Sequence, residues 1–315
     1  MLLDVFSRVM VPILVVVGAG FWLRRVTDLD VRPLTRVTLY LLSPALIFSS
    51  LVEAEIGGGQ TLRIVAFSVL LVAAMGLLAL AAGRALGYSR ETNTALMLST
   101  MFTNTGNYGL PLALFAFGGD GFDRAVLFFV AQGVLVHTLG IYLAGSGGGE
   151  GRGGWRGGAT TLLRMPQLYA VAAALTLRWV GPEVVTQSRG VVGSLFEGIS
   201  LMGSAAIPLL LVVLGAELAR ARVEAADAVG VSVAAAIRLL AAVPVSYGLA
   251  RALGLDPLAT DLAVVLGSMP TAVNVTVLAL EFDVRPKLVG SIVVVTTVLS
   301  FATLTVLLGA LGAGG

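Results

Sequence analysis

Long apolar stretches alternate with short polar segments along almost the whole chain. A transmembrane helix needs about 20 mainly apolar residues to cross the hydrocarbon core of a bilayer. Ten stretches meet or approach this length, at residues 5–23, 34–52, 62–86, 92–117, 122–144, 163–180, 191–219, 226–252, 258–280 and 287–311. The pattern predicts an all-α integral membrane protein with ten transmembrane helices.

A glycine-rich segment divides these ten spans into two groups of five. Residues 145–160 are dominated by glycine, which is typical of a flexible linker. We therefore predict a first five-helix repeat at residues 1–144, a cytoplasmic linker at 145–160 and a second five-helix repeat at 161–315.

The two halves share a weak internal similarity, in which the same residue types recur at equal spacings. Pro44 and Glu53 in the second span match Pro208 and Glu217 in the seventh, and Asn107 and Phe115 in the fourth match Asn274 and Phe282 in the ninth. Each half holds an odd number of spans, so the second half enters the membrane upside down. This predicts two inverted five-helix repeats.

The fourth span contains the polar run Thr-Asn-Thr-Gly-Asn-Tyr-Gly-Leu-Pro at residues 103–111. An unsatisfied polar group in hydrocarbon costs several kcal/mol, so such a run must line a cavity or face protein. Gly106, Gly109 and Pro111 are expected to break the helix there, and Pro270 to break the ninth span. Broken helices that cross near the membrane midplane are typical of the binding site of a secondary transporter.

Composition excludes several other classes of protein. The 315 residues are 57% hydrophobic and 12% charged, whereas a soluble domain is about 25% charged. Cysteine is absent and His137 is the single histidine, so no metal site, catalytic thiol or cofactor is expected. The chain contains no HExxH or GxSxG motif, so no catalytic residue is expected and the protein is predicted not to be an enzyme.

The basic residues predict how the chain is oriented in the membrane. With the N-terminus outside, thirteen of the twenty basic residues fall in cytoplasmic loops and six fall outside, with Arg238 left within the eighth span. The positive-inside rule therefore predicts a multi-pass protein of the inner (plasma) membrane with both termini outside. This distribution also explains the basic pI without a nucleic-acid partner. The lipid bilayer is the expected surrounding.

These motifs resemble the auxin efflux carrier family. The similarity covers nearly the whole chain and is greatest to the prokaryotic, malate- or malonate-permease-like branch, which is distantly related to plant auxin carriers and bile-acid sodium symporters. The residues that carry it are 42–48, 104–112, Gln132, 166–169, 214–215, Arg238 and Pro270.

The resemblance implies a scaffold made of spans 1, 2, 6 and 7 and a mobile transport domain made of spans 3–5 and 8–10. It also implies an elevator-type motion, a homodimer formed through the scaffold and a small organic anion as substrate, bound where spans 4 and 9 cross. In the plant carriers, the residues at the positions of Asn104 and Gln167 contact the substrate carboxylate. The long cytoplasmic loop of those carriers is replaced here by the glycine-rich linker.

Neutral amides and half-helix N-termini can bind an anion without a formal positive charge. The substrate-binding residues expected on this basis and from the resemblance are Asn104, Thr105, Asn107, Tyr108, Gln132, Gln167, Thr271 and Asn274. Two alternatives stay open for the asparagines. Their side chains can instead cap the broken helix ends, or hydrogen-bond a neighbouring helix.

Arg238 and His137 are candidates for coupling or for structural support. A mid-membrane arginine needs a partner or a wet cavity. Arg238 therefore either attracts the anion or couples protons, or it holds the transport domain together by binding carbonyl groups at a broken helix. His137 either relays protons or hydrogen-bonds a neighbouring helix. Glu217 lies near the end of its predicted span and is interpreted as an interfacial residue.

Other classes of transporter remain alternatives. A cation–proton antiporter of similar fold needs carboxylates at the crossing, where spans 4 and 9 carry amides and hydroxyls. A sodium-coupled symporter of the bile-acid type is compatible with the hydroxyls of Thr103, Thr105 and Thr271. The substrate, the coupling ion (proton, sodium or none), the direction of transport and the oligomeric state are left open by the sequence.

Overall fold

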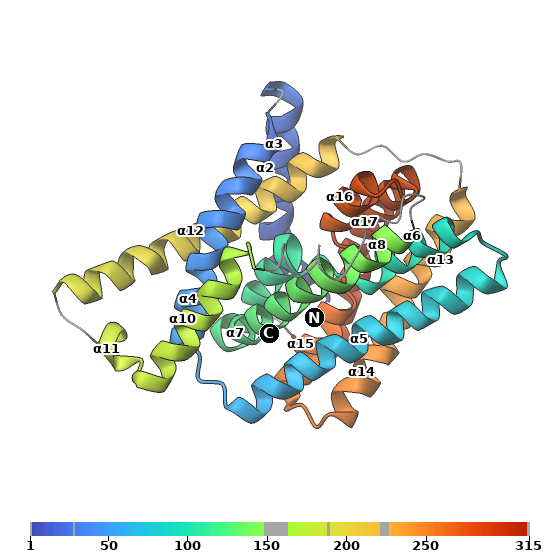
Figure 1. Ribbon diagram of the computed structural model, residues 1–315. Helices are drawn as coiled ribbons and strands as arrows, with labels where there is room; N and C mark the ends of the chain where they lie inside the picture. Colours follow the sequence, from blue (N-terminus) through green and yellow to red (C-terminus); the bar gives the residue numbers. More distant parts are fainter. Residues whose placement is uncertain (1, 28, 148–162, 188–189, 221–226, 314–315) are drawn as a thin grey trace.

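The computed structural model describes residues 2–27, 29–147, 163–187, 190–220 and 227–313 (Figure 1). These residues are helical throughout, apart from short connections and one isolated backbone bridge. Of the predicted linker at 145–160, residues 145–147 complete a helix and the rest lies outside the described residues.

The first half contains long helices in which single π-helical turns are inserted. Its elements are α1 (Leu2–Val5), η1 (Phe6–Met10), α2 (Val11–Thr27), α3 (Val31–Val37), η2 (Thr38–Leu42), α4 (Ser43–Glu53), α5 (Gly58–Ala85), α6 (Arg90–Met101), η3 (Thr105–Gly109), α7 (Leu110–Leu135), η4 (Val136–Gly140) and α8 (Ile141–Gly147). A π-helical turn widens a helix by one residue and is frequent at functional sites.

The second half repeats this mixture of long and divided helices. Its described elements are α10 (Pro166–Val180), α11 (Glu183–Thr186), α12 (Val191–Arg220), α13 (Ala228–Ala236), η6 (Ile237–Ala241), α14 (Ala242–Ala252), α15 (Pro257–Gly267), α16 (Asn274–Glu281) and α17 (Pro286–Leu311).

Among the described residues, seven helices are long and apolar enough to cross a membrane. The protein is therefore a multi-pass membrane protein. The difference from the ten predicted spans has local causes. Helix α10 is only 15 residues long, and the ninth predicted span is divided between α15 and α16. The fourth predicted span is likewise divided, and its second part continues into the fifth through a bend at Gly118, whose φ is 66°.

Helix α12 crosses α2 and α4 on one side of the molecule, and α10 packs against α4 (Figure 1). The α2–α12 crossing is close because it is made by glycines. A Cβ atom on Gly20 would collide with the carbonyl oxygen of Val212, and a Cβ atom on Gly215 with that of Val17. Small residues allow this backbone approach in membranes, where dispersion contacts drive helix association.

The remaining helices pack around α5, α6 and α17. Helix α5 contacts α6 and α7, α14 contacts α15, and α17 contacts α13 and α16. Figure 1 shows α5, α13, α14, α16 and α17 on the side of the molecule opposite the α12 crossing.

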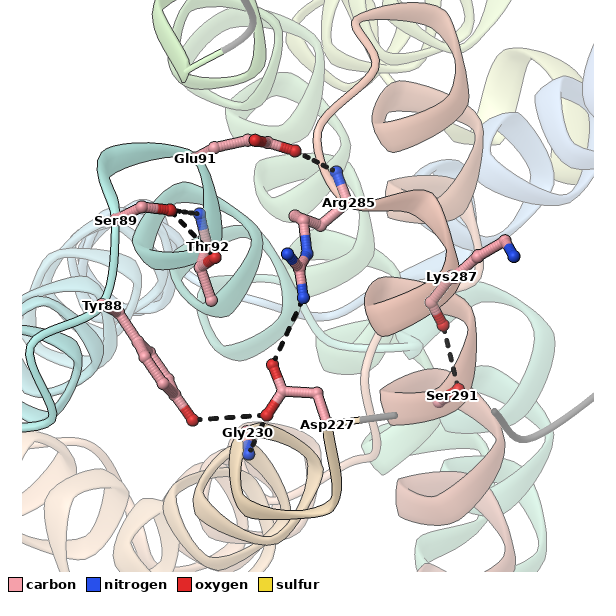
Figure 2. Close-up of polar contacts among 9 residues, drawn as sticks. All are labelled: Tyr88, Ser89, Glu91, Thr92, Asp227, Gly230, Arg285, Lys287 and Ser291. Atoms are coloured by element: carbon pink, nitrogen blue, oxygen red, sulfur yellow. Dashed lines mark hydrogen bonds and ion pairs between the residues drawn. The ribbon is translucent and has the colours of Figure 1, made fainter. Parts of the chain in front are cut away.

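A polar cluster joins three of these helices where they begin. Asp227 accepts the backbone N–H of Gly230 as the N-cap of α13, and it forms an ion pair with Arg285 at the start of α17 (3.6 Å). Arg285 in turn donates its backbone N–H to Glu91 of α6 (Figure 2). Burial, followed by the negative charge of Asp227, raises the pKa of the hydrogen-bonded Tyr88.

Two non-helical segments cross in the interior, between α6 and η3 and between α15 and α16. The backbone N–H of Asn104 donates to the carbonyl oxygen of Pro270 (2.8 Å), and that of Ala272 donates to Phe102 (3.0 Å). Thr103 and Thr271 thereby form an antiparallel bridge. Thr271 also ties the crossing to the adjacent helices, because its hydroxyl donates to the carbonyl of Ser99 (2.7 Å).

Arg238 is fully buried in η6, beside the C-terminal end of α6. Its Nη1 donates to the carbonyl oxygen of Thr100 (2.5 Å), in the last turn of that helix. Its Nε and Nη2 atoms have no hydrogen-bond partner among the described residues. A cation at a helix C-terminus is favoured by the unpaired carbonyl groups there.

We expect Gly215→Ala to destabilise the fold, because the new methyl group overlaps the Val17 carbonyl at the helix crossing. Overpacking of this kind costs about 1–3 kcal/mol. Thermal unfolding in detergent should show a lower melting temperature than for the wild type. Gly18→Ala, on the open face of α2, is the matched control and should not lower it. Equal melting temperatures for the two variants would contradict the close contact.

We expect Arg238→Ala to be destabilising as well, because the buried Thr100 carbonyl loses its donor. An unsatisfied buried acceptor costs about 1–3 kcal/mol. Arg238→Lys should recover part of the loss, since an ammonium group retains the charge but not the planar fork. An unchanged melting temperature for Arg238→Ala, measured beside the wild type, would show that Arg238 does not support the crossing.

Candidate functional site

A cavity of about 70 Å³ lies against the crossing of the two non-helical segments. Its wall comes from α3, η2, the start of α4, the segments around η3 and α16, α7, η4 and α12. The lining residues are Thr35, Thr38, Leu39, Ser43, Thr103, Asn104, Thr105, Gly106, Asn107, Phe129, Gln132, Gly133, Val136, His137, Leu210, Val213, Glu217, Ala272, Val273 and Asn274.

The polar run at 103–111 forms one side of this cavity. Asn104 ends the non-helical segment with φ −76° and ψ 58°, and its carbonyl oxygen accepts the N–H of Gly109 (3.0 Å). The hydroxyls of Thr103 and Thr105 are hydrogen-bonded to each other (2.6 Å). Gly106 leaves room for the ring of Phe129, which a Cβ atom at that position would touch.

Four buried polar atoms in the cavity wall have no hydrogen-bond partner among the described residues. They are Asn104 Nδ2, Gln132 Nε2, Gln132 Oε1 and Glu217 Oε2. Asn104 and Gln132 are only 5% and 3% exposed. Buried polar groups are nearly always paired, and leaving one unpaired costs about 1–3 kcal/mol. A cluster of such atoms around one cavity therefore indicates a site that is completed by a ligand or by water.

Asn107 and Asn274 also line the cavity. Asn107 is half-buried in η3 and Asn274 is exposed at the first residue of α16. Neither η3 nor α16 receives a side-chain hydrogen bond at its N-cap. The capping role that the sequence left open for Asn104 is therefore absent at the start of η3, and Asn104 Nδ2 has no hydrogen-bond partner among the described residues.

Three predicted substrate-binding residues lie outside the cavity wall. Tyr108 is fully buried, with its hydroxyl on the sulfur of Met10 (3.6 Å) and its ring against Phe301. The hydroxyl of Thr271 bonds to Ser99, as described above. Gln167 donates to the carbonyl oxygen of Leu39 (2.9 Å). Each has a protein partner that hydropathy alone could not reveal.

The predicted helix-breaking residues occupy different places. Gly106 lines the cavity, whereas Gly109 packs against Leu266 and Pro111 follows in the first turn of α7. The carbonyl of Pro270 accepts a hydrogen bond in the crossing.

Of the two coupling or support candidates, only His137 reaches the cavity. Its Nδ1 lies 2.8 Å from the carbonyl oxygen of Gly133, one turn earlier in the same helix. Arg238 lies outside the wall, at the end of α6.

The most informative residue missed in the sequence is Glu217. The structure places it in the cavity wall with a covered oxygen, where the sequence alone indicated a residue at the membrane interface. The hydroxyl residues Thr35, Thr38 and Ser43 were also missed. Their helical spacing on one face of the second span was the available signal.

The cavity wall is polar but carries little charge. Glu217 and His137 are its titratable side chains, and no lysine or arginine lines it among the described residues. The described part of the chain also contains no group of three or more His, Cys, Asp or Glu side chains that could hold a metal ion. The available ligand contacts are thus amide donors, hydroxyls and main-chain groups.

The sequence matches the profile of a family described as membrane transport protein over residues 5–152 and 159–308. It is 27% identical to an uncharacterized transporter of Methanothermobacter thermautotrophicus over 95% of this chain and 96% of that one. An uncharacterized transporter of Methanocaldococcus jannaschii is 23% identical over 85% of each chain.

A third relative, named "Putative malonate transporter" in Rhizobium meliloti, is 28% identical over 66% of this chain and 63% of its own length. The family profile covers nearly the whole chain, as do the motifs at 42–48 and 104–112 that resemble auxin efflux carriers. The chain therefore belongs to the membrane transport protein family, which is the auxin efflux carrier family, and it is a transporter.

Proposed function

We propose that this protein is a secondary active transporter of small organic anions, with the substrate bound in the cavity at the crossing. The observation that carries the proposal is a pair of buried amide donors, Asn104 Nδ2 and Gln132 Nε2. Both belong to residues that line the cavity, and neither has a hydrogen-bond partner among the described residues. A carboxylate supplies the acceptors that these donors lack.

The backbone adds a second favourable contribution. The helix that starts at Thr105 and the helix that starts at Asn274 both begin among residues that line the cavity, so the positive ends of their dipoles lie beside it. Such ends stabilise an anion without lysine or arginine. A site of this kind can bind an anion and release it again, as transport requires.

The small cavity favours a small substrate. A volume of about 70 Å³ suits a short mono- or dicarboxylate better than a large amphipathic anion. The relative named as a malonate transporter points in the same direction. We therefore choose malonate as the first probe and treat auxin-like aromatic monocarboxylates as the second.

We further propose that α2, the continuous run α3–η2–α4, α10 and α12 form a scaffold, through which a homodimer forms. The helices from α5 to α8 and from α13 to α17 would move as the transport domain of an elevator. The cavity lies between these groups, with Glu217 and Thr35 on one side and Asn104 and Gln132 on the other. The substrate would then cross the membrane together with the transport domain. Each group would contain helices from both of the proposed inverted repeats, residues 1–144 and 161–315, of a ten-span protein.

A sodium-coupled symporter is less well supported. Of the three hydroxyls that the sequence offered as sodium ligands, those of Thr103 and Thr105 belong to the cavity wall, whereas Thr271 lies outside it with its hydroxyl on Ser99. A cation–proton antiporter would need carboxylates on the crossing segments themselves. Transport assays with and without a sodium gradient separate these alternatives from the proposal.

We expect both termini to lie outside the inner membrane. Single cysteines can report this cleanly, because the chain has none of its own. Thr186→Cys, in the exposed α11, should react with a membrane-impermeant maleimide on intact cells, whereas the exposed Arg164→Cys should react only after permeabilisation. The reverse pattern would invert the proposed orientation.

We expect Asn104→Ala to weaken malonate binding by about 1–3 kcal/mol, which is roughly a 5- to 150-fold higher Kd. The reason is the loss of a hydrogen bond to a charged group. Binding to purified protein and uptake into proteoliposomes would be measured together. Gln187→Ala, an exposed amide outside the cavity, is the control. Unchanged binding and uptake in folded Asn104→Ala protein would remove Asn104 from the site.

A further inference from the structure

We propose that Glu217 is the proton-binding residue of the substrate cavity, so that one proton enters with each substrate anion. Glu217 lies in the wall of the same cavity as Asn104 and Gln132. It belongs to α12 of the proposed scaffold, whereas the two amides belong to the proposed transport domain. This inference deepens the proposed anion transport and rests on it.

The position of Glu217 is fixed by helix packing. Gly215, two residues earlier, lies against the backbone of Val17 and Phe21 in α2, and Leu214 and Ala216 are fully buried. These contacts hold the last turns of α12 beside the cavity. The carboxylate therefore does not extend freely into solvent, and its Oε2 is covered and has no hydrogen-bond partner among the described residues.

No positive group in the cavity wall neutralises this carboxylate. His137 of η4 is the other titratable residue that lines the cavity, and its Nδ1 is engaged with Gly133. Arg24 and Arg25 of α2 and Tyr40 of η2 belong to elements that pack on α12, yet they lie outside the wall. Arg25 instead lies over the ring of Phe21, 5.4 Å from its centroid.

The other charged and titratable groups on elements packed against α12 also lie outside the wall. They are Arg32 and Arg36 on α3, Glu53 on α4, Tyr108 on η3, Asp120, Asp123 and Arg124 on α7, and Glu183 on α11. Arg220, one turn after Glu217 in α12, is exposed and also lies outside the wall. Among the described residues, Glu217 therefore lines the substrate space without a compensating ion pair.

An anion and an ionised carboxylate repel each other at such short range, and the repulsion is strong where water is scarce. Protonation of Glu217 removes the repulsion and turns an acceptor into an O–H donor toward the substrate. The proton comes from water on the side of uptake and returns to water on the other side. Substrate and proton thus bind cooperatively, which is the linkage that symport requires.

The sign of the pH effect follows from this linkage. Because the anion complex holds one more proton than the free protein, malonate affinity should rise as the pH falls. The limiting slope is about tenfold in Kd per pH unit for one proton. Glu217→Gln keeps the shape of the side chain but carries no charge, so its affinity should be high and nearly independent of pH.

The test is malonate binding to purified wild-type protein from pH 6.5 to 8.5, by calorimetry in two buffers of different ionisation enthalpy, so that proton uptake is counted directly. Melting temperatures verify folding. Glu217→Asp should retain proton uptake, and Glu217→Gln should abolish it. Glu197→Gln, an exposed glutamate of the same helix, is the matched control and should behave as the wild type. His137→Gln should keep the pH dependence.

Three outcomes would overturn the inference. The first is wild-type binding of malonate with no proton uptake, and the second is a pH slope that survives in folded Glu217→Gln protein or disappears in His137→Gln. The third is a dependence on sodium in place of protons. In the first two, anion binding persists and the proposed function stands. The third would instead favour the sodium-coupled symporter. If neither malonate nor an aromatic monocarboxylate binds at any pH, the proposed function fails, and this inference fails with it.

Discussion

The structure depends on two main-chain hydrogen bonds between segments that are far apart in sequence. The bonds from Asn104 to Pro270 and from Ala272 to Phe102 join two interruptions of helices in the middle of apolar stretches. Backbone groups that leave a helix cannot be satisfied by lipid, so each interruption needs the other. Neither half could hold its broken segment alone, which makes the crossing the point where the two halves must assemble.

Helix N-termini and a helix C-terminus both lie at the crossing, and they have different surroundings. The helices that begin at Thr105 and Asn274 open toward the cavity, whereas α6 ends next to Arg238. The positive helix ends thus lie beside the cavity where an anion is proposed to bind, and the guanidinium of Arg238 bonds to the Thr100 carbonyl at the end of α6. A permanent cation bonded to Thr100, and outside the cavity wall, supports the geometry of the site without fixing a charge inside it.

The sequence predicted the polar, interrupted spans and several residues of the cavity wall. Individual residues show which features of the site it could not predict. Asn104 stood out because amides are costly in an apolar span, and Gln132 because of the family resemblance; both line the cavity. The same two grounds also indicated Tyr108 and Thr271, which are polar residues of the broken spans, and Gln167, which the resemblance implied. Their partners are Met10, Ser99 and Leu39, which are distant in sequence for all three, so hydropathy could not distinguish a satisfied polar group from an unsatisfied one.

Glu217 illustrates the opposite failure, since its place near the end of an apolar stretch made an interfacial role the simplest interpretation. The length of α12 and its glycine contact with α2 decide otherwise, because they bring the last turns of the helix beside the cavity. An uncompensated carboxylate there would oppose an anion unless it carried a proton. The same two features, amide donors and a single carboxylate, then account for both anion recognition and its dependence on protons, without any cation in the cavity wall.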